Sequence, residues 1–340
     1  MDKKSVLMIG GTGTISMSIT RLLAASSDVE VTVLNRGSKA LPEGAVQLIS
    51  DINDTAHMKE ILQGRSFDAV CDFLIYTPEQ AEQRIALFQG ITKQFIYIST
   101  VCVFDHEDIF LLNEGSLQNN RYSEYGRNKS AAEKVFIRAN QEQGFPVTIV
   151  RPSQTYGYDR IPLSVKGKTC WSVIDRILND RQVIVHGDGK AIWHSMHTED
   201  FAYNFRQLLF KEETLGHSIN LVNPECATWD MIYYELYRQL GKEPRIVHLS
   251  SETIAASSRY DNTSAILGDK QYSNIYDPHR MMEYIPDFQC NISLEQGIGK
   301  YLNYMNQHEE LKQKDPVFDL WCLGMINALD SCRDAVEEMY

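Results

Sequence analysis

The chain has 340 residues and a mass of 38.9 kDa, enough for a nucleotide-binding domain and a smaller second domain. Hydrophobic residues make up 43% of the chain and charged residues 23%, as in a globular protein that buries a core. The formal net charge of -12 argues against a broad surface for nucleic acid or an anionic membrane, because clustered cations bind phosphate groups.

Cysteine usage and hydropathy indicate the cellular compartment. The seven cysteines are scattered and form no Cys-x-x-Cys pair, which is typical of reduced thiols and predicts neither a disulfide framework nor a zinc site. No apolar run reaches the length of a membrane-spanning helix, and the apolar run that begins at Val6 is too short for a signal peptide. We therefore expect a cytoplasmic protein with neither a membrane nor a nucleic-acid partner.

The first half of the chain alternates short β-rich runs with helical patterns, which is typical of βαβ units in a parallel sheet. The expected strands are residues 5–10, 30–35, 46–50, 67–73, 94–99 and 147–151, and the expected helices are residues 14–25, 55–63, 78–88 and 122–143. This pattern predicts an α/β fold, a doubly wound parallel Rossmann sheet.

The rhythm changes after Pro152, where loops lengthen. Strand-like runs at 183–186, 219–222 and 245–249 are mixed with helical patterns near 198–211 and 227–240. We interpret residues 1–165 as a dinucleotide-binding Rossmann domain. Residues 166–340 are expected to form mainly a smaller substrate-binding lobe, with some elements returning to the Rossmann sheet. The pattern over residues 315–339 predicts a terminal helix, and the sequence indicates no role for it.

A glycine-rich turn joins the first expected strand to the first expected helix. Gly10 and Gly13 permit a tight turn and a close approach of backbone amides to a pyrophosphate, and the helix N-terminus adds unpaired N–H groups and a favourable dipole. Ser16 stands where a third glycine is common, and its small side chain still lets helix and strand pack closely. The turn predicts dinucleotide binding.

The ends of the second and third strands indicate which dinucleotide is bound. The second strand ends in Asn35 and Arg36, so the carboxylate that would bind the ribose 2′-hydroxyl of NAD is absent and a guanidinium that suits a 2′-phosphate is present. We favour NADP, while NAD stays open because Arg36 can also be a solvated surface charge. Asp51 and Ile52 close the third strand, where an adenine contact is expected, although an aspartate there is also a common turn residue.

Tyr125 and Lys129 are the candidate catalytic pair, four residues apart on one face of an expected helix. A nearby ammonium would lower the phenol pKa, so that Tyr125 could exchange a proton with a substrate oxygen while hydride moves to or from a nicotinamide. Ser99 and Thr100 end the fifth strand, where a hydroxyl could polarise that oxygen or simply cap the strand.

These motifs occur in an order that resembles the extended short-chain dehydrogenase/reductase family, in its NAD-dependent epimerase/dehydratase branch. The resemblance covers roughly residues 5–300 and rests on Gly10-Gly-Thr-Gly13, Asp51-Ile52, Ser99-Thr100, Tyr125-xxx-Lys129, Arg151-Pro152, His186-Gly-Asp-Gly189 and His197-Thr-Glu-Asp200. It implies that Thr100 is the catalytic Ser/Thr, that Tyr125 is the acid/base and that Lys129 holds the nicotinamide ribose. The expected cofactor-binding residues are Gly10, Thr12, Gly13, Thr14, Ile15, Asn35, Arg36, Asp51, Ile52, Ser99, Tyr125, Lys129, Pro152 and Ser153.

The chain also departs from the pattern that the resemblance implies. Trp193 stands where nucleotide-sugar epimerases commonly have an arginine that grips the substrate diphosphate, and Val101 replaces the acidic residue typical of a 4,6-dehydratase. We expect Thr100, Trp193, His194 and His197 to contact substrate, while a core tryptophan stays open for Trp193. The two histidines are interpreted as neutral contacts and not as metal ligands, so no metal is expected.

Three functions stay open on the sequence. The main hypothesis is an NAD(P)-dependent oxidoreductase or epimerase acting on a hydroxyl or carbonyl carbon of a sugar, glycoside or nucleotide sugar. The second is an NADPH-dependent carbonyl reductase of a non-sugar metabolite, and the third is a non-catalytic NADP-sensing or RNA-associated protein. A homodimer is compatible with the resemblance, in which pairing often uses helices near 78–90 and 122–144.

Overall fold

The computed structural model describes residues 3–106, 111–257, 260 and 262–340. The chain divides into two compact units. Unit 1 comprises Met1–Gly157, His194–Glu225 and Ile275–Ile292, and unit 2 comprises Tyr158–Trp193, Cys226–Asn274 and Ser293–Tyr340. The first boundary lies after Gly157, ahead of the expected residue 165, and two later segments return to unit 1.

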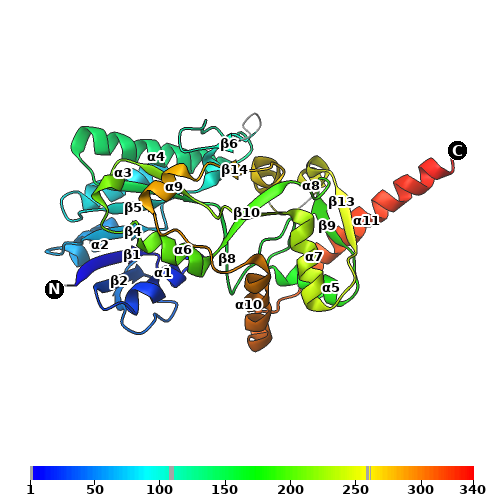
Figure 1. Ribbon diagram of the computed structural model, residues 1–340, viewed down its shortest axis with the longest axis horizontal. Coiled ribbons are helices and arrows are strands. Elements are labelled where there is room, and N and C mark those ends of the chain that lie inside the picture. Colours follow the sequence, from blue (N-terminus) through cyan, green and yellow to red (C-terminus); the bar gives the residue numbers. More distant parts are fainter. Residues whose placement is uncertain (1–2, 107–110, 258–259, 261) are drawn as a thin grey trace. The chain divides into compact units, whose positions relative to one another are not determined.

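Unit 1 is built on a seven-stranded sheet in the order β3-β2-β1-β4-β5-β7-β11 (Figure 1). Its strands are β1 (Lys4–Ile9), β2 (Val29–Asn35), β3 (Val46–Ile49), β4 (Ala69–Asp72), β5 (Phe95–Ile98), β7 (Val147–Pro152) and β11 (Ser218–Leu221). Every neighbouring pair is parallel. The chain winds outward from β1 in both directions, so the predicted doubly wound Rossmann sheet is confirmed.

Helices cover both faces of this sheet. Helices α1 (Thr14–Ala24), α6 (Thr198–Arg206) and α9 (His279–Tyr284) contribute to one buried cluster, and α2 (Thr55–Leu62), α3 (Pro78–Phe88) and α4 (Glu124–Gln143) pack on the other face. Alternation along β1 explains this, because Val6 and Met8 enter the first cluster while Leu7 and Ile9 enter the second. A strand buried on both faces reads as a continuous apolar run, as β1 does.

The returning segments complete unit 1. Strand β11 adds to the edge of β7, and β8 (Gln154–Tyr156) pairs in parallel with the last residues of β10 (Ile192–His197). The short strands β6 (Leu111–Leu112) and β14 (Ile275–Tyr276) pair with each other, and η1 (Val101–Val103) and η2 (Glu212–Thr214) are single helical turns. These short elements were not expected from the sequence, because two or three residues carry too little periodicity.

Unit 2 contains a small parallel pair of strands, β9 (Val183–His186) and β13 (Ile246–Leu249), with helices around it. The other elements are α5 (Trp171–Leu178), β12 (Cys226–Thr228), α7 (Trp229–Leu240), α8 (Ser251–Ser257), η3 (Thr263–Lys270), α10 (Leu294–Gln307), η4 (Glu309–Leu311) and α11 (Pro316–Glu337). Among the described residues, no helix has both the length and the apolar character that crossing a membrane requires. All seven cysteines carry free thiols.

Candidate active site

The glycine-rich turn after β1 is held in shape by Ser16. Its hydroxyl donates to the Gly10 carbonyl oxygen at 2.7 Å and accepts from the Gly13 amide at 2.9 Å. Gly10 has φ +78°, and a Cβ there would lie 2.7 Å from the Leu74 side chain, so both conformation and space require glycine. Ser16, at the position where a third glycine is common, therefore braces the turn as well as letting α1 pack on the sheet.

A pocket of about 500 Å³ opens beside this turn, at the carboxyl ends of β1, β2 and β3. The predicted residues that line it are Gly10, Thr12, Gly13, Asn35, Arg36, Asp51 and Ile52. The structure thus brings together the glycine turn and the ends of the second and third strands. The carboxyl edge of a parallel sheet is where such folds bind ligands. The sequence prediction missed Ser38, Lys39 and Tyr76, which line the same pocket.

The end of β2 presents hydrogen-bond donors to this pocket. The Asn35 side-chain oxygen accepts from the Gly37 amide at 2.8 Å and from the Gln47 amide group at 3.0 Å, while its buried Nδ2 has no partner among the described residues. Lys39 Nζ donates to the Thr12 carbonyl oxygen at 3.2 Å, which places an ammonium next to the glycine turn. The Asp51 side chain makes a local hydrogen bond, in which its Oδ1 accepts from the backbone amide of Asn53.

The start of α4 packs tightly against the loop after β5. A Cβ on Gly126 would lie far inside van der Waals contact with the carbonyl oxygen of Cys102, and the Asn120 side chain donates to the same oxygen at 2.9 Å. Thr100 begins this loop, and its hydroxyl accepts from the Cys102 amide at 3.2 Å. Gly126 thus allows the start of α4, the helix that carries Tyr125, to pack closely on the loop that follows β5. The sequence analysis assigned Gly126 no role, although it lies between the two predicted catalytic residues.

Lys129 lies one helical turn after Tyr125 and is buried, with 2% of its surface exposed. Its ammonium donates to the Ile98 carbonyl oxygen at 2.7 Å and lies 5.8 Å from the centre of the Tyr125 ring. Two further tyrosine rings, of Tyr76 and Tyr97, lie 4.9 and 5.0 Å from the same nitrogen. Burial lowers the pKa of Lys129 to about 8, against the opposing effect of nearby carboxylates.

Tyr76 is a second aromatic residue at this site. It follows β4, its ring centre lies 6.3 Å from that of Tyr125, and its backbone amide donates to Gln80 at the start of α3. At the end of β4, the buried carboxylate of Asp72 pairs with Arg84 at 3.0 Å and accepts from the Leu74 amide at 2.7 Å. The position of Tyr76 just beyond a central strand was the signal that the sequence offered for it.

A buried ion pair fixes α4 on the sheet. Arg151 on β7 donates from Nε to one oxygen of Glu133 at 2.9 Å and from Nη2 to the other at 2.6 Å. Both side chains are buried, and an unpaired charge in this position would strongly destabilise the fold. Glu133 lies one turn after Lys129, and the bidentate pair therefore sets the position of the helix that carries Tyr125 and Lys129.

The other predicted site residues, after β5, after β7 and on β10, differ in their hydrogen bonds. Ser99 and Ser153 are buried, with hydroxyl oxygens that have no partner among the described residues. His194 Nδ1 lies 2.7 Å from the Asn223 carbonyl oxygen, so Nδ1 carries a proton, and burial lowers the pKa of the ring. His197 caps α6 by accepting from the Glu199 amide at 3.3 Å.

Trp193 has the surroundings of a core residue. It is 4% exposed, and its ring lies 4.9 Å from that of Trp229 within unit 2.

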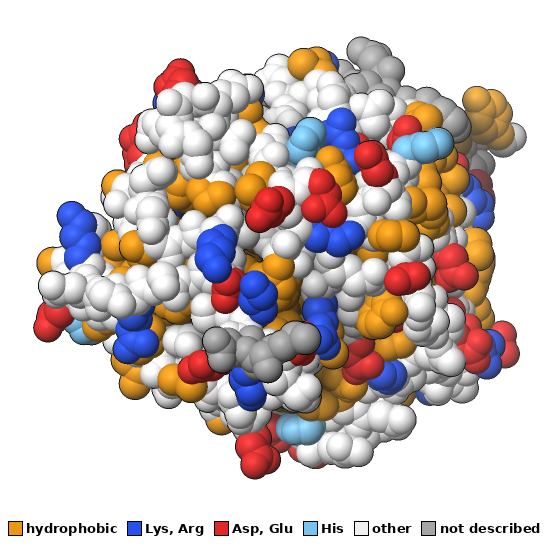
Figure 2. Space-filling view, turned by 60° about the vertical axis from the view of Figure 1, so that its left-hand side comes forward, with side chains coloured by type: hydrophobic (Ala, Val, Ile, Leu, Met, Phe, Trp, Pro, Cys, Tyr) orange, Lys and Arg blue, Asp and Glu red, His pale blue; other side chains and the backbone are white. Residues whose placement is uncertain are grey.

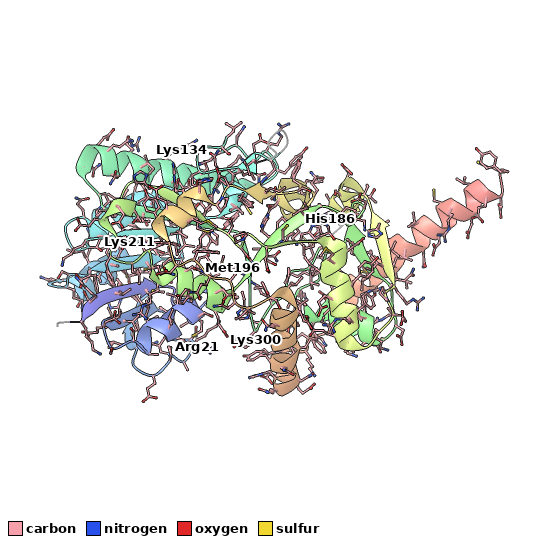
Figure 3. All side chains as sticks on the ribbon, in the orientation of Figure 1. Arg21, Lys134, His186, Met196, Lys211 and Lys300 are labelled. Carbon is pink, nitrogen blue, oxygen red and sulfur yellow. The ribbon has the colours of Figure 1, made fainter. Side chains whose placement is uncertain are left out.

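The histidine of unit 2 in the predicted motifs, His186 on β9, is labelled in Figure 3. Both of its ring nitrogens are in hydrogen bonds, one with Ser164 Oγ at 2.6 Å and the other with the Lys270 carbonyl oxygen at 2.9 Å. Among the described residues, no group of three or more His, Cys, Asp or Glu side chains could hold a metal ion. Figure 2 shows basic side chains interspersed with acidic ones on one face of the molecule.

The sheet order, the glycine turn and the pocket define a dinucleotide-binding Rossmann protein. Residues 6–221 match the model of the NAD dependent epimerase/dehydratase family. The chain therefore belongs to this family, which confirms the predicted resemblance.

Similarity to individual proteins is low in sequence and high in fold. The chain is 22% identical over 223 residues to a trifunctional UDP-glucose 4,6-dehydratase, epimerase and reductase of Arabidopsis thaliana, covering 65% of this chain and 30% of that enzyme. It is 24% identical over 173 residues to a UDP-glucose 4-epimerase of Vibrio cholerae, covering 45% of this chain and 52% of that enzyme. The chain thus spans 30% of the length of the first of these relatives and 52% of the length of the second.

Two solved structures show the same fold. An epimerase of Methanothermobacter thermautotrophicus superposes with a TM-score of 0.74 and 17% identity, covering 92% of this chain and 94% of that one. A UDP-glucuronic acid 4-epimerase of Bacillus cereus, in complex with UDP-glucuronic acid and NAD, superposes with a TM-score of 0.72 and 19% identity, covering 89% and 99%.

Proposed function

We propose that this protein binds NADP and catalyses reversible oxidation at a hydroxyl-bearing carbon of a sugar-like substrate, with Tyr125 as the acid/base. The observation that carries the proposal is the buried Lys129 ammonium 5.8 Å from the centre of the Tyr125 ring, on a helix whose start packs at Gly126 against the loop that Thr100 begins. An exposed phenol over a buried cation suits proton exchange with a bound ligand, since 42% of Tyr125 is exposed.

The residues at the pocket suit a pyridine dinucleotide. The backbone at Gly10 and Gly13 and the N-terminus of α1 would hold the pyrophosphate. At the end of β2, three groups can donate: the Nδ2 of Asn35, which has no partner in the described part of the chain, the guanidinium of Arg36 and the ammonium of Lys39. A 2′-phosphate accepts from such donors, whereas the NAD ribose prefers a carboxylate there, so NADP is favoured over NAD.

The chemistry follows from the groups around Tyr125. The bound nicotinamide would supply the hydride acceptor or donor. Tyr125 would take the proton of the substrate hydroxyl in one direction and return it in the other, while Lys129 stabilises the phenolate by its charge. The Thr100 hydroxyl would polarise the substrate oxygen. Ser99, Pro152 and Ser153 would contact the cofactor, and His194 and His197 would contact the substrate.

Sugar nucleotides are the substrates named for the relatives, which supports a sugar-like ligand here. Trp193, which replaces the expected arginine, packs in the core of unit 2 and brings no charge for a diphosphate. A glycoside or free sugar is therefore as well supported as a nucleotide sugar. Carbonyl reduction of a non-sugar metabolite is the second candidate function, favoured by the NADP-type end of β2.

One experiment separates these functions. Purified protein is denatured and the released dinucleotide identified by mass spectrometry, and the native protein is then incubated with sugars and nucleotide sugars. Epimerisation gives stereochemical inversion by NMR without net change in nicotinamide absorbance, whereas a reductase consumes NADPH. A protein that binds no dinucleotide, even added in excess, would overturn the proposal. Binding of NADP without turnover of any carbonyl or hydroxyl compound would instead support a cofactor sensor.

A further inference from the structure

His194, on β10, is a buried histidine that is held in one orientation. Its Nδ1 donates to the carbonyl oxygen of Asn223 at 2.7 Å, and its ring meets that of Tyr276 edge-on, with the ring centres 5.6 Å apart. Burial lowers the pKa of the imidazole, against the opposing effect of the hydrogen bond with Asn223, so the ring is neutral near neutral pH. A neutral ring with its proton on Nδ1 can only accept a hydrogen bond at Nε2.

The surroundings of His194 supply no donor for Nε2. The residue is 6% exposed, and this nitrogen has no hydrogen-bond partner among the described residues. His186 is buried as well, yet hydrogen bonds occupy both of its ring nitrogens. Because nearly all buried polar atoms in proteins are paired, an acceptor for which the described chain supplies no donor indicates a donor on a bound molecule.

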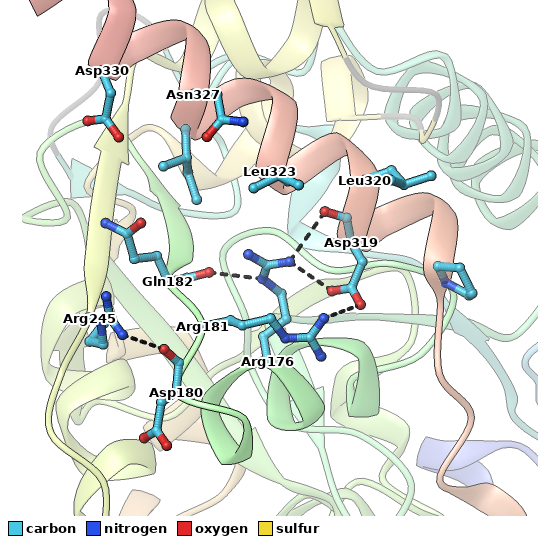
Figure 4. Close-up of a pocket in the computed structure, with 12 residues that line it drawn as sticks. Arg176, Asp180, Arg181, Gln182, Arg245, Asp319, Leu320, Leu323, Asn327 and Asp330 are labelled. Carbon is cyan, nitrogen blue, oxygen red and sulfur yellow. Dashed lines mark hydrogen bonds and ion pairs between the residues drawn. The ribbon is translucent and has the colours of Figure 1, made fainter.

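The charged side chains of a groove in unit 2 are, by contrast, paired with one another. This groove has a volume of about 620 Å³ and is bordered by α5 and α11. Asp319 accepts from Arg176 at 2.7 Å and from Arg181 at 2.5 Å, and Arg245 donates to the Asp180 carbonyl oxygen at 2.6 Å (Figure 4). Each of these guanidinium groups binds an oxygen of the protein itself, so the groove points less clearly to a ligand.

His194 lies next to the stretch of chain that follows β7. The parallel ladder of β8 and β10 begins with Gln154 opposite Ser195, so Ser153 and His194 come directly before it on neighbouring strands. The Ser153 hydroxyl is also buried and has no partner in the described part of the chain. Two polar groups that lack partners thus come together at the carboxyl edge of the sheet, where such folds bind ligands.

The same region adjoins the loop of Thr100. The Ser99 amide donates to the Val150 carbonyl oxygen at 2.8 Å, which continues the parallel pairing of β5 and β7, so Thr100 lies beside the end of β7. Ser153 follows β7 directly. Thr100, Ser153 and His194 therefore follow one another on neighbouring stretches of chain, and a small molecule that reaches Thr100 can extend to His194.

The chemistry of the reaction indicates which part of the substrate donates to His194. Oxidation turns the reacting hydroxyl into a carbonyl, whose oxygen has no hydrogen and cannot donate to Nε2. Tyr125 and Thr100 serve this oxygen in the proposed function. A donor that keeps its hydrogen throughout the reaction is a different hydroxyl of the substrate.

We propose that His194 is a specificity-determining residue, whose Nε2 accepts a hydrogen bond from a second hydroxyl of the substrate. This inference rests on the proposed function and narrows its substrate class to polyhydroxylated compounds such as sugars. An aldehyde or ketone with no other hydroxyl leaves Nε2 buried without a donor, and a site built for a hydroxyl discriminates strongly against an analogue that lacks it.

Two substitutions distinguish the two ring nitrogens. His194→Asn keeps an N–H near the position of Nδ1, for the hydrogen bond to Asn223, and has no atom near the position of Nε2. His194→Gln instead places its amide near the position of Nε2. The control is His217→Asn, at an exposed histidine that precedes β11 at the opposite edge of the sheet.

The kinetic test gives each protein saturating NADP or NADPH and follows turnover of hexoses, UDP-hexoses, their monodeoxy analogues and cyclohexanone. For one hydroxyl position we expect the wild type to prefer the parent compound about 10- to 100-fold in kcat/KM. His194→Asn should abolish this preference, mainly through a higher KM for the parent compound. His194→Gln should retain part of the preference, and His217→Asn all of it.

Nitrogen-15 NMR of the histidine side chains reports on Nε2 without requiring turnover. The His194 signal is identified by its absence from the spectrum of His194→Asn. We expect the signal of an unprotonated nitrogen, which moves upfield when a hexose or UDP-hexose is added to the NADP-bound protein and does not move with NADP alone.

An active enzyme whose substrate preference survives in His194→Asn would overturn the inference and leave the proposed function intact. The inference also fails if NADP alone shifts the His194 signal, because the cofactor is then the donor, or if no hexose or UDP-hexose shifts it. Failure of the proposed function looks different, because the protein then binds no dinucleotide at all.

Discussion

Lys129 Nζ lies 2.7 Å from the carbonyl oxygen of Ile98, the last residue of β5, and this hydrogen bond joins α4 to the central sheet. The contact is buried, and three tyrosine rings face the same ammonium. The hydrogen bond and the burial hold this charge in place near the ring of Tyr125. A spacing of four residues predicts that Tyr125 and Lys129 share a helix face, but it does not reveal this contact with β5.

Replacing Tyr125 with phenylalanine tests the acid/base role. The ring and its packing remain, while the group that exchanges a proton is lost, so we expect kcat to fall by about 10²- to 10⁴-fold. Steady-state kinetics and the dissociation constant of NADP measured by fluorescence separate catalysis from binding. The matched control is Tyr203→Phe on α6, an exposed tyrosine outside the site that should keep full activity. Unchanged turnover in Tyr125→Phe would remove the phenol from the mechanism.

The buried ammonium of Lys129 should make stability depend on alkaline pH. Its pKa is about 8 in the folded protein, against an ordinary value of 10.5, because burial disfavours the charge. The unfolded chain therefore binds more protons between these values, and the free energy of unfolding rises as the pH rises through them. This gain in the free energy of unfolding is lost again as the pH falls through 8, because the folded protein then also takes up the proton. The full change is about 3 kcal/mol.

The measurement compares urea unfolding of the wild type with that of Lys129→Met, an apolar residue of similar length, from pH 7.5 to pH 10.5. The comparison cancels the effects of other groups that titrate in this range. We therefore expect the free energy of unfolding of the wild type to increase relative to that of Lys129→Met as the pH rises. A constant difference would mean that the ammonium is not desolvated in the folded protein.

Two helical glycines should respond to alanine in opposite directions. Gly126 packs against the Cys102 carbonyl oxygen, so Gly126→Ala must displace the start of α4 from the Thr100 loop, with loss of both stability and activity. Gly324 in α11 has open space where a Cβ would lie, with nothing within 4 Å, and Gly324→Ala should stabilise the helix by up to about 1 kcal/mol. Thermal unfolding and turnover check both. Equal effects of the two substitutions would contradict the close approach at Gly126.

Cofactor preference should depend on the donors after β2. Removing the guanidinium in Arg36→Ala costs a charge-assisted hydrogen bond to a 2′-phosphate, so NADP binding should weaken about 10- to 100-fold while NAD binding changes little. Isothermal titration with both dinucleotides measures the split. Lys59→Ala, on α2 away from the pocket, serves as the control. Equal losses for NAD and NADP, or tighter binding of NAD by the wild type, would argue against the NADP preference.

Much of unit 1 was predictable because its elements are defined by local pattern. β1 is a continuous apolar run, and a glycine turn and a helix follow it directly. α3 and β3 likewise lie within a residue of their expected bounds. Pairing of Tyr125 with Lys129 was also predictable, since residues four apart share a helix face wherever the helix lies.

Other features depended on contacts between segments far apart in the chain. Tyr76 lies near Tyr125 only because α3, which begins two residues after Tyr76, packs against α4, and the tight packing at Gly126 exists only because α4 meets the loop after β5. Trp193, for which the sequence left both a substrate contact and a core role open, packs against Trp229. Sequence patterns thus determined which residues share a strand or a helix face. The tertiary structure decided burial, close approach and electrostatic environment, because these depend on what packs opposite each face.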